Sequence, residues 1–307
     1  MKKIFIYAFC ALIGSSFAGC SDSDEILEPT RQEENFYKVP DDATGPEAEV
    51  RRKFYNDNKV NLLFSDVLRR EYLGKDAFGD DVWKEEKIDF RYNVTSYNEN
   101  VEYSWELFDN DSDKSRAAEL ISRYLMPHFG EKLRPFSIMA VKTLTSTDYY
   151  GPAEVKTVNN VSCRAVSVGE IMDEAVTDQQ IEEYFKEVCK DILNVKISNL
   201  YQSAPEFEEF RALSSVYLGK YISSVAPEWD GINMSIIYNL GYIGFFNLYY
   251  PAYDMFHMYG NDDFKDFFNL AFDYTPDEVE EMYGEYPKVM TKYRAVRDAF
   301  LSAGYVF

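Results

Sequence analysis

The stretch TDQQIEEYFKEVCKDILNV, Thr177–Val195, is the strongest helical segment of the chain and sets the fold class that we expect. Thr177 followed by Gln180 is typical of a capping box, in which each side chain accepts a hydrogen bond from a backbone N–H at the helix start. Apolar residues then recur at helical spacing: Ile181, Phe185, Val188, Ile192 and Val195. We therefore predict an amphipathic helix from Thr177, with the polar residues of its second half away from the apolar face.

Short strand candidates precede this helix, and further helical segments follow it. The expected strands cover residues 60–64, 88–94, 136–144, 154–158 and 163–168, interrupted by helices at 47–57 and 113–126. Later helices are expected at 205–223, 262–272 and 276–302, the last with Thr275 as N-cap and Pro276 at its first position. Strands followed by helices predict an α+β domain, strand-rich in its N-terminal half and helical in its C-terminal half.

Length and composition favour one large globular domain. The 307 residues are 46% hydrophobic and 17% aromatic, which suffices for a packed core. No internal repeat divides residues 47–307, so we predict a single domain there. The 53 acidic residues against 32 basic ones give a net charge of −21, which argues against binding of nucleic acid through a basic face.

The N-terminus has the pattern of a targeting segment. Lys2 and Lys3 precede an apolar run at residues 4–13, which is too short to span a bilayer as a helix. Small residues then lead to Phe17-Ala18-Gly19-Cys20, which resembles a bacterial lipobox. We predict a signal peptide at 1–19 and a lipid anchor on Cys20; an ordinary signal peptide is the alternative.

The segment after Cys20 is acidic and contains three prolines within residues 20–46, so we interpret it as a tether. Its first residues, Ser21–Glu25, resemble the surface-export signal of some Gram-negative lipoproteins. This predicts an outer-membrane lipoprotein that faces the cell surface, although a plain charged tether would leave the periplasmic side open.

The inventory of catalytic groups is thin. The chain has two histidines, His128 and His257, and lacks a Gly-rich phosphate loop, a G-x-S-x-G elbow and a CxxC pair. The many carboxylates leave a glycosidase open but do not identify its two catalytic acids. Cys163 and Cys189 remain after the anchor, and we expect them to be unpaired.

Three local patterns each have a functional and a structural interpretation. His257 with Asp254 and Asp262 would supply one imidazole and two carboxylates to a metal, or His257 would simply cap or stack. The tyrosines Tyr249, Tyr250 and Tyr253 would form a platform for a sugar or peptide, or would belong to the core. The repeated acids at 109, 111 and 113 lack the glycine and glutamate of a calcium loop and indicate a helix start.

The chain as a whole resembles the zinc-binding metallopeptidase lipoproteins found beside glycan-uptake systems, a gluzincin-like family. The resemblance spreads over most of residues 47–307 and rests on several short segments: Phe54–Asn58 before Val60–Phe64, Ala117–Pro127 before Phe136–Leu144, and Tyr286–Lys288 before Lys292–Asp298. It implies a zincin-like fold in which a helix carries H-E-x-x-H and a downstream acid completes the zinc site.

This resemblance maps the motif onto the helix that begins at Thr177. Lys190 then takes the place of the first histidine, Asp191 that of the glutamate and Asn194 that of the second histidine. Asp262 matches the third ligand. Because an ammonium and a carboxamide are poor zinc ligands, we expect no zinc or other cofactor and no hydrolysis. Lys190 is expected to form a salt bridge with Asp262 or Asp266 in the place of the metal.

The sequence thus predicts a surface lipoprotein with a degenerate metallopeptidase-like domain that binds a glycan, a peptide or an envelope protein. One alternative is a hydrolase with a zinc site built from Asp254, His257 and Asp262. The other is an aromatic-platform glycan-binding module.

Overall fold

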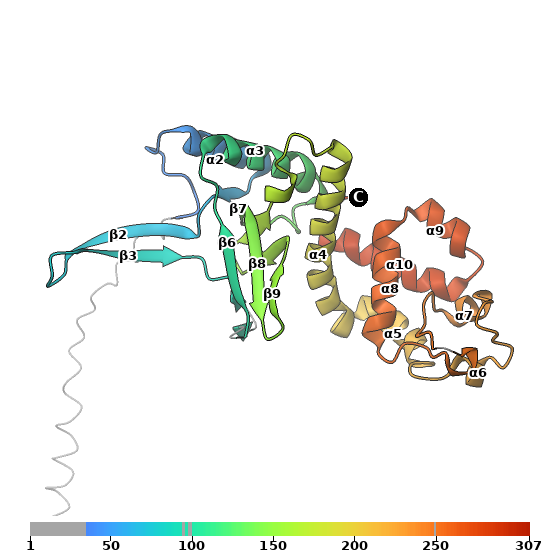
Figure 1. Cartoon of the computed structure of the whole chain (residues 1–307). Helices are drawn as coiled ribbons and strands as arrows, with labels where there is room; N and C mark the ends of the chain where they lie inside the picture. Colours follow the sequence, from blue (N-terminus) through green and yellow to red (C-terminus); the bar gives the residue numbers. More distant parts are fainter. Residues whose placement is uncertain (1–34, 94–95, 98–99, 249) are drawn as a thin grey trace, which may run out of the picture. The chain divides into compact units, whose positions relative to one another are not determined.

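The computed structural model describes residues 35–93, 96–97, 100–248 and 250–307, so the predicted signal peptide, Cys20 and Tyr249 lie outside the described residues. Tyr37–Phe307 form one compact unit, separate from residues 1–36, and it begins ten residues before the predicted start at Glu47. Strands lie mostly in its N-terminal half and helices in its C-terminal half, which confirms the predicted α+β class (Figure 1). Within these ranges no helix is long and apolar enough to cross a membrane.

A four-stranded sheet forms the centre of the N-terminal half, in the order β1-β7-β11-β10. Three strands are parallel, and β10 pairs antiparallel at the edge. Because side chains alternate along a strand, Ile138 and Ala140 face one apolar cluster while Met139 and Val141 face another. The strands are β1 (Asn61–Leu63), β7 (Ser137–Val141), β10 (Thr157–Asn159) and β11 (Arg164–Ser167).

A second sheet, in the order β6-β8-β9, begins where β7 ends. Its strands are β6 (Glu102–Glu106), β8 (Thr143–Asp148) and β9 (Gly151–Glu154). The chain leaves the first sheet at Lys142, whose N–H donates to Glu106 O at 2.8 Å. The single strand predicted at 136–144 is therefore two strands in different sheets.

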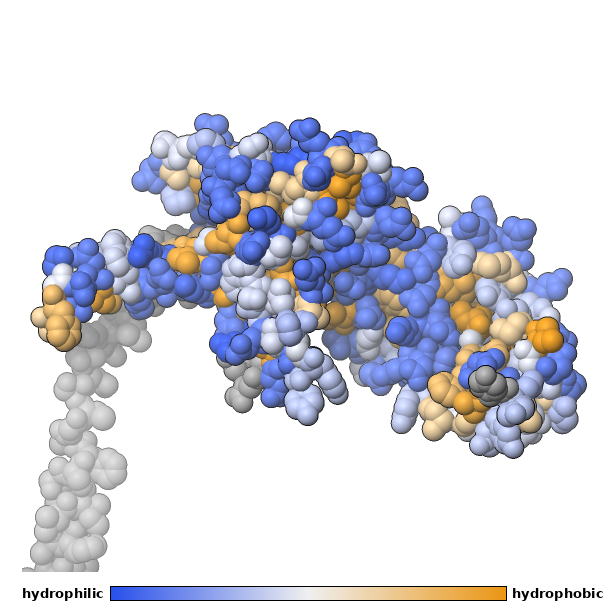
Figure 2. Space-filling model, viewed as in Figure 1, coloured by the Kyte–Doolittle hydropathy of each residue, from blue (hydrophilic) through white to orange (hydrophobic). Residues whose placement is uncertain are grey.

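The hairpin of β2 (Val67–Lys75) and β3 (Asp81–Lys87) was absent from the sequence prediction. Most of its residues are exposed on both faces, so neither face is buried and the sequence shows no alternation of apolar and polar residues. Orange side chains gather at its free end in Figure 2. The predicted strand at 88–94 is wrong except for β4 (Tyr92–Asn93), which pairs with β5 (Ser96–Tyr97). Ile88 and Phe90 are instead buried in the loop that follows β3.

The helices agree with the prediction where the apolar period is uninterrupted. The described helices are α2 (Pro46–Asn58), α3 (Asp111–Leu120) with η1 (Ile121–Leu125) and η2 (Met126–His128), η3 (Gly169–Ile171), α4 (Asp178–Ser203), η4 (Pro205–Phe207), α5 (Glu208–Ser215), α6 (Ile222–Val225), α7 (Ser235–Leu240), η5 (Pro251–Tyr253), α8 (Gly260–Asp273), α9 (Pro276–Tyr283) and α10 (Pro287–Ala303). The helix predicted at 276–302 is two helices, because the residue before Pro287 is disfavoured from helical geometry. The helix predicted at 205–223 likewise breaks after Ser215.

Helix α4 joins the two halves. Both hydrogen bonds of its predicted capping box are present, between Thr177 and Gln180. The helix contacts β10 of the sheet and also α8 and α10 of the helical half (Figure 1). Its buried side carries the predicted apolar residues except Val195, which is exposed.

A buried ion pair links the helices of the C-terminal half. Lys292 of α10 donates to Asp263 of α8, with Nζ and Oδ2 2.6 Å apart, and both side chains have 0% exposure. Ser214 of α5 donates to the same carboxylate oxygen at 2.5 Å. Burial raises the pKa of Asp263 and lowers that of Lys292, and each charge offsets part of the shift in the other.

Aromatic rings enclose the Lys292 ammonium. Its Nζ lies 4.1 Å from the ring centroid of Tyr242, with Phe210 and Phe267 at 5.0 and 5.2 Å. Such cation–π contacts strengthen when the cation is desolvated. The Tyr242 hydroxyl in turn donates to the Ser214 carbonyl. One lysine thus connects α5, α8, α10 and the loop after α7.

We expect Lys292→Met to lower the free energy of unfolding by about 3–5 kcal/mol, because it leaves a buried carboxylate without its counter-charge. The double variant with Asp263→Leu removes both charges and should recover most of that loss. Urea unfolding followed by circular dichroism measures both. Lys53→Ala, in a pair whose side chains are 81% and 49% exposed, is the control and should cost under about 1 kcal/mol. A Lys292→Met loss as small as that of the control would contradict this account.

Candidate functional site

The positions predicted to hold a degenerate motif lie on α4, but Lys190 does not contact the predicted acids. Its Nζ lies 2.8 Å from Oδ2 of Asp273, and it also lies 5.7 Å from the ring centroid of Phe272. The predicted salt bridge to Asp262 or Asp266 is therefore wrong. Asp273, the acid that Lys190 does contact, lies on the same helix as Asp262 and Asp266, but at its C-terminal end.

The crossing of α4 and α8 explains this difference. Asp273 is the last residue of α8 and Asp262 is in its first turn, so they are about three turns, or roughly 16 Å, apart along the helix. Lys190 reaches the C-terminal end. Asn194 accepts a hydrogen bond from Ser198 at 3.0 Å, and Asp191 is exposed. The structure thus does not bring positions 190, 191 and 194 together with Asp262.

The alternative metal residues are also engaged elsewhere. Asp254 is buried, and its carboxylate accepts from Trp229 Nε1 at 3.0 Å and from the Leu248 N–H at 2.9 Å. His257 pairs with Asp266 on α8. Across the described ranges, no three His, Cys, Asp or Glu side chains are grouped as a metal site. The residues predicted for an atypical zinc site, Asp254, His257 and Asp262, are therefore not assembled into one.

Two of the predicted platform tyrosines are exposed and form an aromatic group with a third. Tyr250 and Tyr253 are 65% and 56% exposed, and Tyr221 is 45% exposed. The ring centroids of Tyr253 and Tyr221 lie 6.3 Å apart, and those of Tyr253 and Tyr250 lie 6.4 Å apart. We call these three residues the tyrosine cluster. Tyr221 was not predicted, because it lies about thirty residues earlier in the chain.

Backbone pairing brings the tyrosines together. Met255 bridges antiparallel to Tyr221 on one side and to Phe246 on the other. The Ile222 N–H donates to Asp254 O at 2.8 Å, which fixes the two segments side by side. Tyr221 and Tyr253 are therefore neighbours through hydrogen bonds that do not involve their side chains.

Asp254 stabilises the loops beneath the cluster. Asp254 directly follows Tyr253 in the chain. Its carboxylate accepts hydrogen bonds from Trp229 and Leu248, so it ties both residues to the segment that carries Tyr253. Gly231, at φ +84°, lies so close that an added Cβ would be 2.8 Å from Cγ of Pro251. A side chain there would displace Pro251, so the glycine is required for this packing. The backbone beneath the cluster is thus held by polar contacts and close packing.

The His257–Asp266 pair connects this base to α8. Nε2 of His257 lies 2.7 Å from Oδ2 of Asp266. Gly244 packs against the pair, since a Cβ on it would be 2.1 Å from the Asp266 carboxylate. Burial lowers the pKa of His257, but the hydrogen bond and charge of Asp266, with the charges of Asp263 and Asp262, outweigh it and raise the pKa above its ordinary value.

The remaining nucleophile candidates are unreactive. Cys163 and Cys189 are free and buried, and burial raises the pKa of each thiol to about 12. Since the thiolate is the nucleophile, neither cysteine suits covalent catalysis. Of the acids at 109, 111 and 113, the last two lie in the first turn of α3, where Asn110 is the N-cap and accepts from the Asp113 N–H at 2.8 Å.

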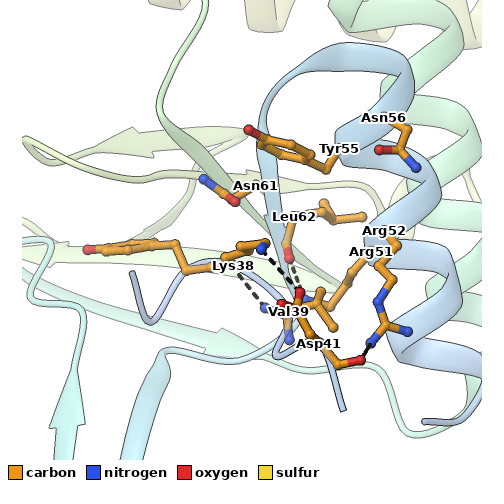
Figure 3. Close-up of a pocket in the computed structure, with 10 residues that line it drawn as sticks. Lys38, Val39, Asp41, Arg51, Arg52, Tyr55, Asn56, Asn61 and Leu62 are labelled. Atoms are coloured by element: carbon orange, nitrogen blue, oxygen red, sulfur yellow. Dashed lines mark hydrogen bonds and ion pairs between the residues drawn. The ribbon is translucent and has the colours of Figure 1, made fainter. Parts of the chain in front are cut away.

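A pocket of about 210 Å³ near the start of the folded unit has a structural role (Figure 3). Its two arginines donate to backbone carbonyls: Arg51 to Leu62 at 2.7 Å, and Arg52 to Pro40 at 2.7 Å. These bonds attach residues before α2 to that helix and to β1. The volume is below the usual range for small-molecule sites, and the guanidinium groups are already engaged.

Comparison with known proteins found no matching family model, no matching curated protein and no matching solved structure.

Sequence reasoning missed the buried Lys292–Asp263 pair, although the sequence contains a signal for it. Asp263 precedes Phe267 by four residues, and Lys292 precedes Val296 by four. Each charged residue therefore lies on the apolar face of its own helix. Two opposite charges on two apolar faces predict a buried ion pair between those helices.

A double-mutant cycle on Lys190 and Asp273 tests the observed salt bridge. Because the two side chains are 30% and 35% exposed, we expect a coupling of about 0.5–1 kcal/mol in the free energy of unfolding. The cycle compares Lys190→Ala, Asp273→Ala and the double variant in urea. Lys190→Ala with Asp262→Ala is the control cycle and should show no coupling. Coupling to Asp262 but not to Asp273 would overturn the assignment.

The His257–Asp266 pair predicts a pH-dependent contribution to stability. The folded-state pKa of His257 is raised above the unfolded one, so the pair stabilises fully below the unfolded-state pKa. The stabilisation is lost as the pH rises through the folded-state pKa. The difference in unfolding free energy between wild type and His257→Gln should therefore be larger at about pH 5 than at about pH 9. In an Asp266→Asn background most of this pH dependence should vanish; an unchanged dependence would count against the pair.

Proposed function

We propose that this chain is a surface-anchored lipoprotein of the outer membrane whose metallopeptidase-like domain binds a glycan chain without hydrolysis. The observation that carries the proposal is the tyrosine cluster, in which Tyr221, Tyr250 and Tyr253 are exposed together on a packed base. The anchor rests on the Phe17–Cys20 pattern, and the zincin-like relation rests on the sequence resemblance.

The geometry of the cluster suits a glycan. A tyrosine offers an apolar ring face to the C–H groups of a sugar and a hydroxyl that both donates and accepts hydrogen bonds. The ring planes of Tyr221 and Tyr253 are 69° apart, and those of Tyr250 and Tyr253 are 79° apart. The three rings therefore present faces in different directions, which favours a twisted chain of sugars over a flat aromatic ligand.

The charge of the protein narrows the class of glycan at this cluster. With a net charge of −21, the chain repels polyanions at long range. A neutral polysaccharide therefore fits the cluster better than an acidic one or a nucleic acid.

The arrangement of the motif positions supports binding over hydrolysis. Lys190 is engaged with Asp273, Asn194 with Ser198, and His257 with Asp266. An ammonium cannot ligate zinc until it loses its proton, and the Lys190 ammonium already contacts the Asp273 carboxylate. The metallopeptidase-like domain would then serve as a scaffold for the tyrosine cluster.

Affinity electrophoresis of the purified full-length protein in gels that contain soluble neutral polysaccharides tests the proposal. Wild type should be retarded by at least one polysaccharide of a panel of xylan, mannan, β-glucan and α-glucan. Tyr250→Ala and Tyr253→Ala should each weaken binding by about tenfold, because each removes a stacking contact of about 1 kcal/mol or more.

Tyr149→Ala is the matched control, since this tyrosine is 93% exposed but lies in the loop between β8 and β9. It should bind as wild type does. If no polysaccharide retards the wild type, and a peptide or an envelope protein binds through Tyr250 instead, the glycan assignment fails.

A further inference from the structure

The exposed aromatic surface continues beyond the tyrosine cluster, across Met255 to Phe246. The Phe246 N–H donates to Met255 O at 2.8 Å, and the Met255 N–H donates back to Phe246 O at 3.1 Å. Two residues that exchange both bonds form a hydrogen-bonded antiparallel pair, whose side chains share a face and whose Cα atoms are about 5.5 Å apart. The side chains of Phe246 and Met255 are therefore neighbours on one face.

Tyr221 lies on the other side of Met255 in a similar way. The backbone hydrogen bonds nearest to this bridge join the residues before and after the two, at 2.8 and 3.0 Å. Tyr221 and Met255 are thus a non-hydrogen-bonded pair, with side chains on the same face and Cα atoms about 4.5 Å apart. Met255 therefore lies between Tyr221 and Phe246, whose Cα atoms are about 10 Å apart across the two pairs.

Burial shows that this shared face is the outer one. Asp254 and Phe256, which flank Met255 in the chain, are 1% and 0% exposed. Since successive side chains of extended backbone point to opposite sides, Met255 points away from the core. Likewise Phe245 packs against a buried tryptophan with ring centroids 5.2 Å apart, whereas Phe246 is 57% exposed.

We call Tyr250, Tyr253, Tyr221, Met255 and Phe246, in this order, the aromatic strip. The first three rings follow one another at centroid distances of 6.4 and 6.3 Å, and the two backbone pairs continue the row to Phe246. Contiguous exposed apolar side chains on a soluble protein mark a binding surface. Met255 adds a flexible apolar side chain that adapts to an irregular ligand between the rings.

The length of the aromatic strip sets the length of its ligand, an inference that rests on the glycan-binding function proposed above. One sugar unit at the tyrosine cluster does not also cover Phe246, because Tyr221 and Phe246 are about 10 Å apart. Phe246 has no hydroxyl, so it offers a sugar only its ring face. We propose that the strip binds a linear run of at least three units of a neutral polysaccharide, one at the tyrosine cluster, one over Met255 and one stacked on Phe246.

Isothermal titration calorimetry of the full-length protein with oligosaccharides of increasing length tests the proposal. The series runs from the monosaccharide to the hexamer of a polysaccharide that retards wild type in the gels. Wild-type affinity should rise with each unit at least as far as the trimer. Phe246→Ala should weaken binding of the trimer and longer chains by about tenfold, because it removes one stacked ring. For the dimer, which the tyrosine cluster and Met255 accommodate, the difference should be under about twofold.

Two further variants separate ring stacking from structure. Phe246→Tyr keeps the ring and should bind the trimer within about twofold of wild type. Phe78→Ala removes another phenylalanine, 91% exposed in the turn between β2 and β3, and should bind as wild type does. Circular dichroism of each variant confirms that it is folded.

The proposal is overturned if Phe246→Ala binds the trimer and longer chains as Phe78→Ala does, or if wild type binds the monosaccharide as tightly as the hexamer. Weakened binding in Tyr253→Ala beside unchanged binding in Phe246→Ala would end the site at the tyrosine cluster and leave the glycan-binding function standing. If wild type binds no polysaccharide of the panel, the glycan-binding function fails, and the longer site fails with it.

Discussion

The buried contact between Lys292 and Asp263 is the interaction on which the helical half depends. Both charges have no exposure: Ser214 and Lys292 donate to Oδ2 of Asp263, and aromatic rings surround the Lys292 ammonium. Oδ1 of Asp263 has no hydrogen-bond partner among the described residues, so the Lys292 charge is what balances this buried carboxylate. This contact fixes α10 against α8 and brings in α5 and the loop before the tyrosine cluster. The loops that carry Tyr221, Tyr250 and Tyr253 extend from this helical base, through the His257–Asp266 pair and the buried carboxylate of Asp254. The backbone that carries the three tyrosines is therefore attached to the helical base by buried polar contacts.

The packing of α4 against α8 determines which acid contacts Lys190, one of the predicted motif positions. Since α4 crosses α8 near its C-terminal end, Lys190 pairs with Asp273 and leaves Asp262 about three turns away. The salt bridge that we expected between Lys190 and Asp262 or Asp266 is therefore not formed. Asp273 also lies 3.6 Å from Lys186, so two lysines of α4 share the carboxylate at the end of α8.

Much of the fold was predictable where local chemistry and burial agree. The capping box and apolar period of α4, the helix at α8 and the buried strand β11 all followed from sequence patterns. The β2–β3 hairpin was not predictable in this way, because neither of its faces is buried and so no alternation marks it. The candidate site was harder to predict from the sequence than the fold. Tyr250 and Tyr253 were found as neighbours in sequence, but Tyr221 joins them through backbone pairing with Met255. Which acid contacts Lys190 depends on where α4 crosses α8, and sequence patterns within each helix do not predict that crossing point.

The central proposal is that this domain binds its ligand without a catalytic metal. The most direct test is the zinc content of full-length wild type and of His257→Ala, measured by mass spectrometry after incubation with excess zinc and desalting. The account predicts much less than one zinc per chain in wild type, with no change in His257→Ala. One tightly bound zinc per chain that is lost in His257→Ala would contradict it.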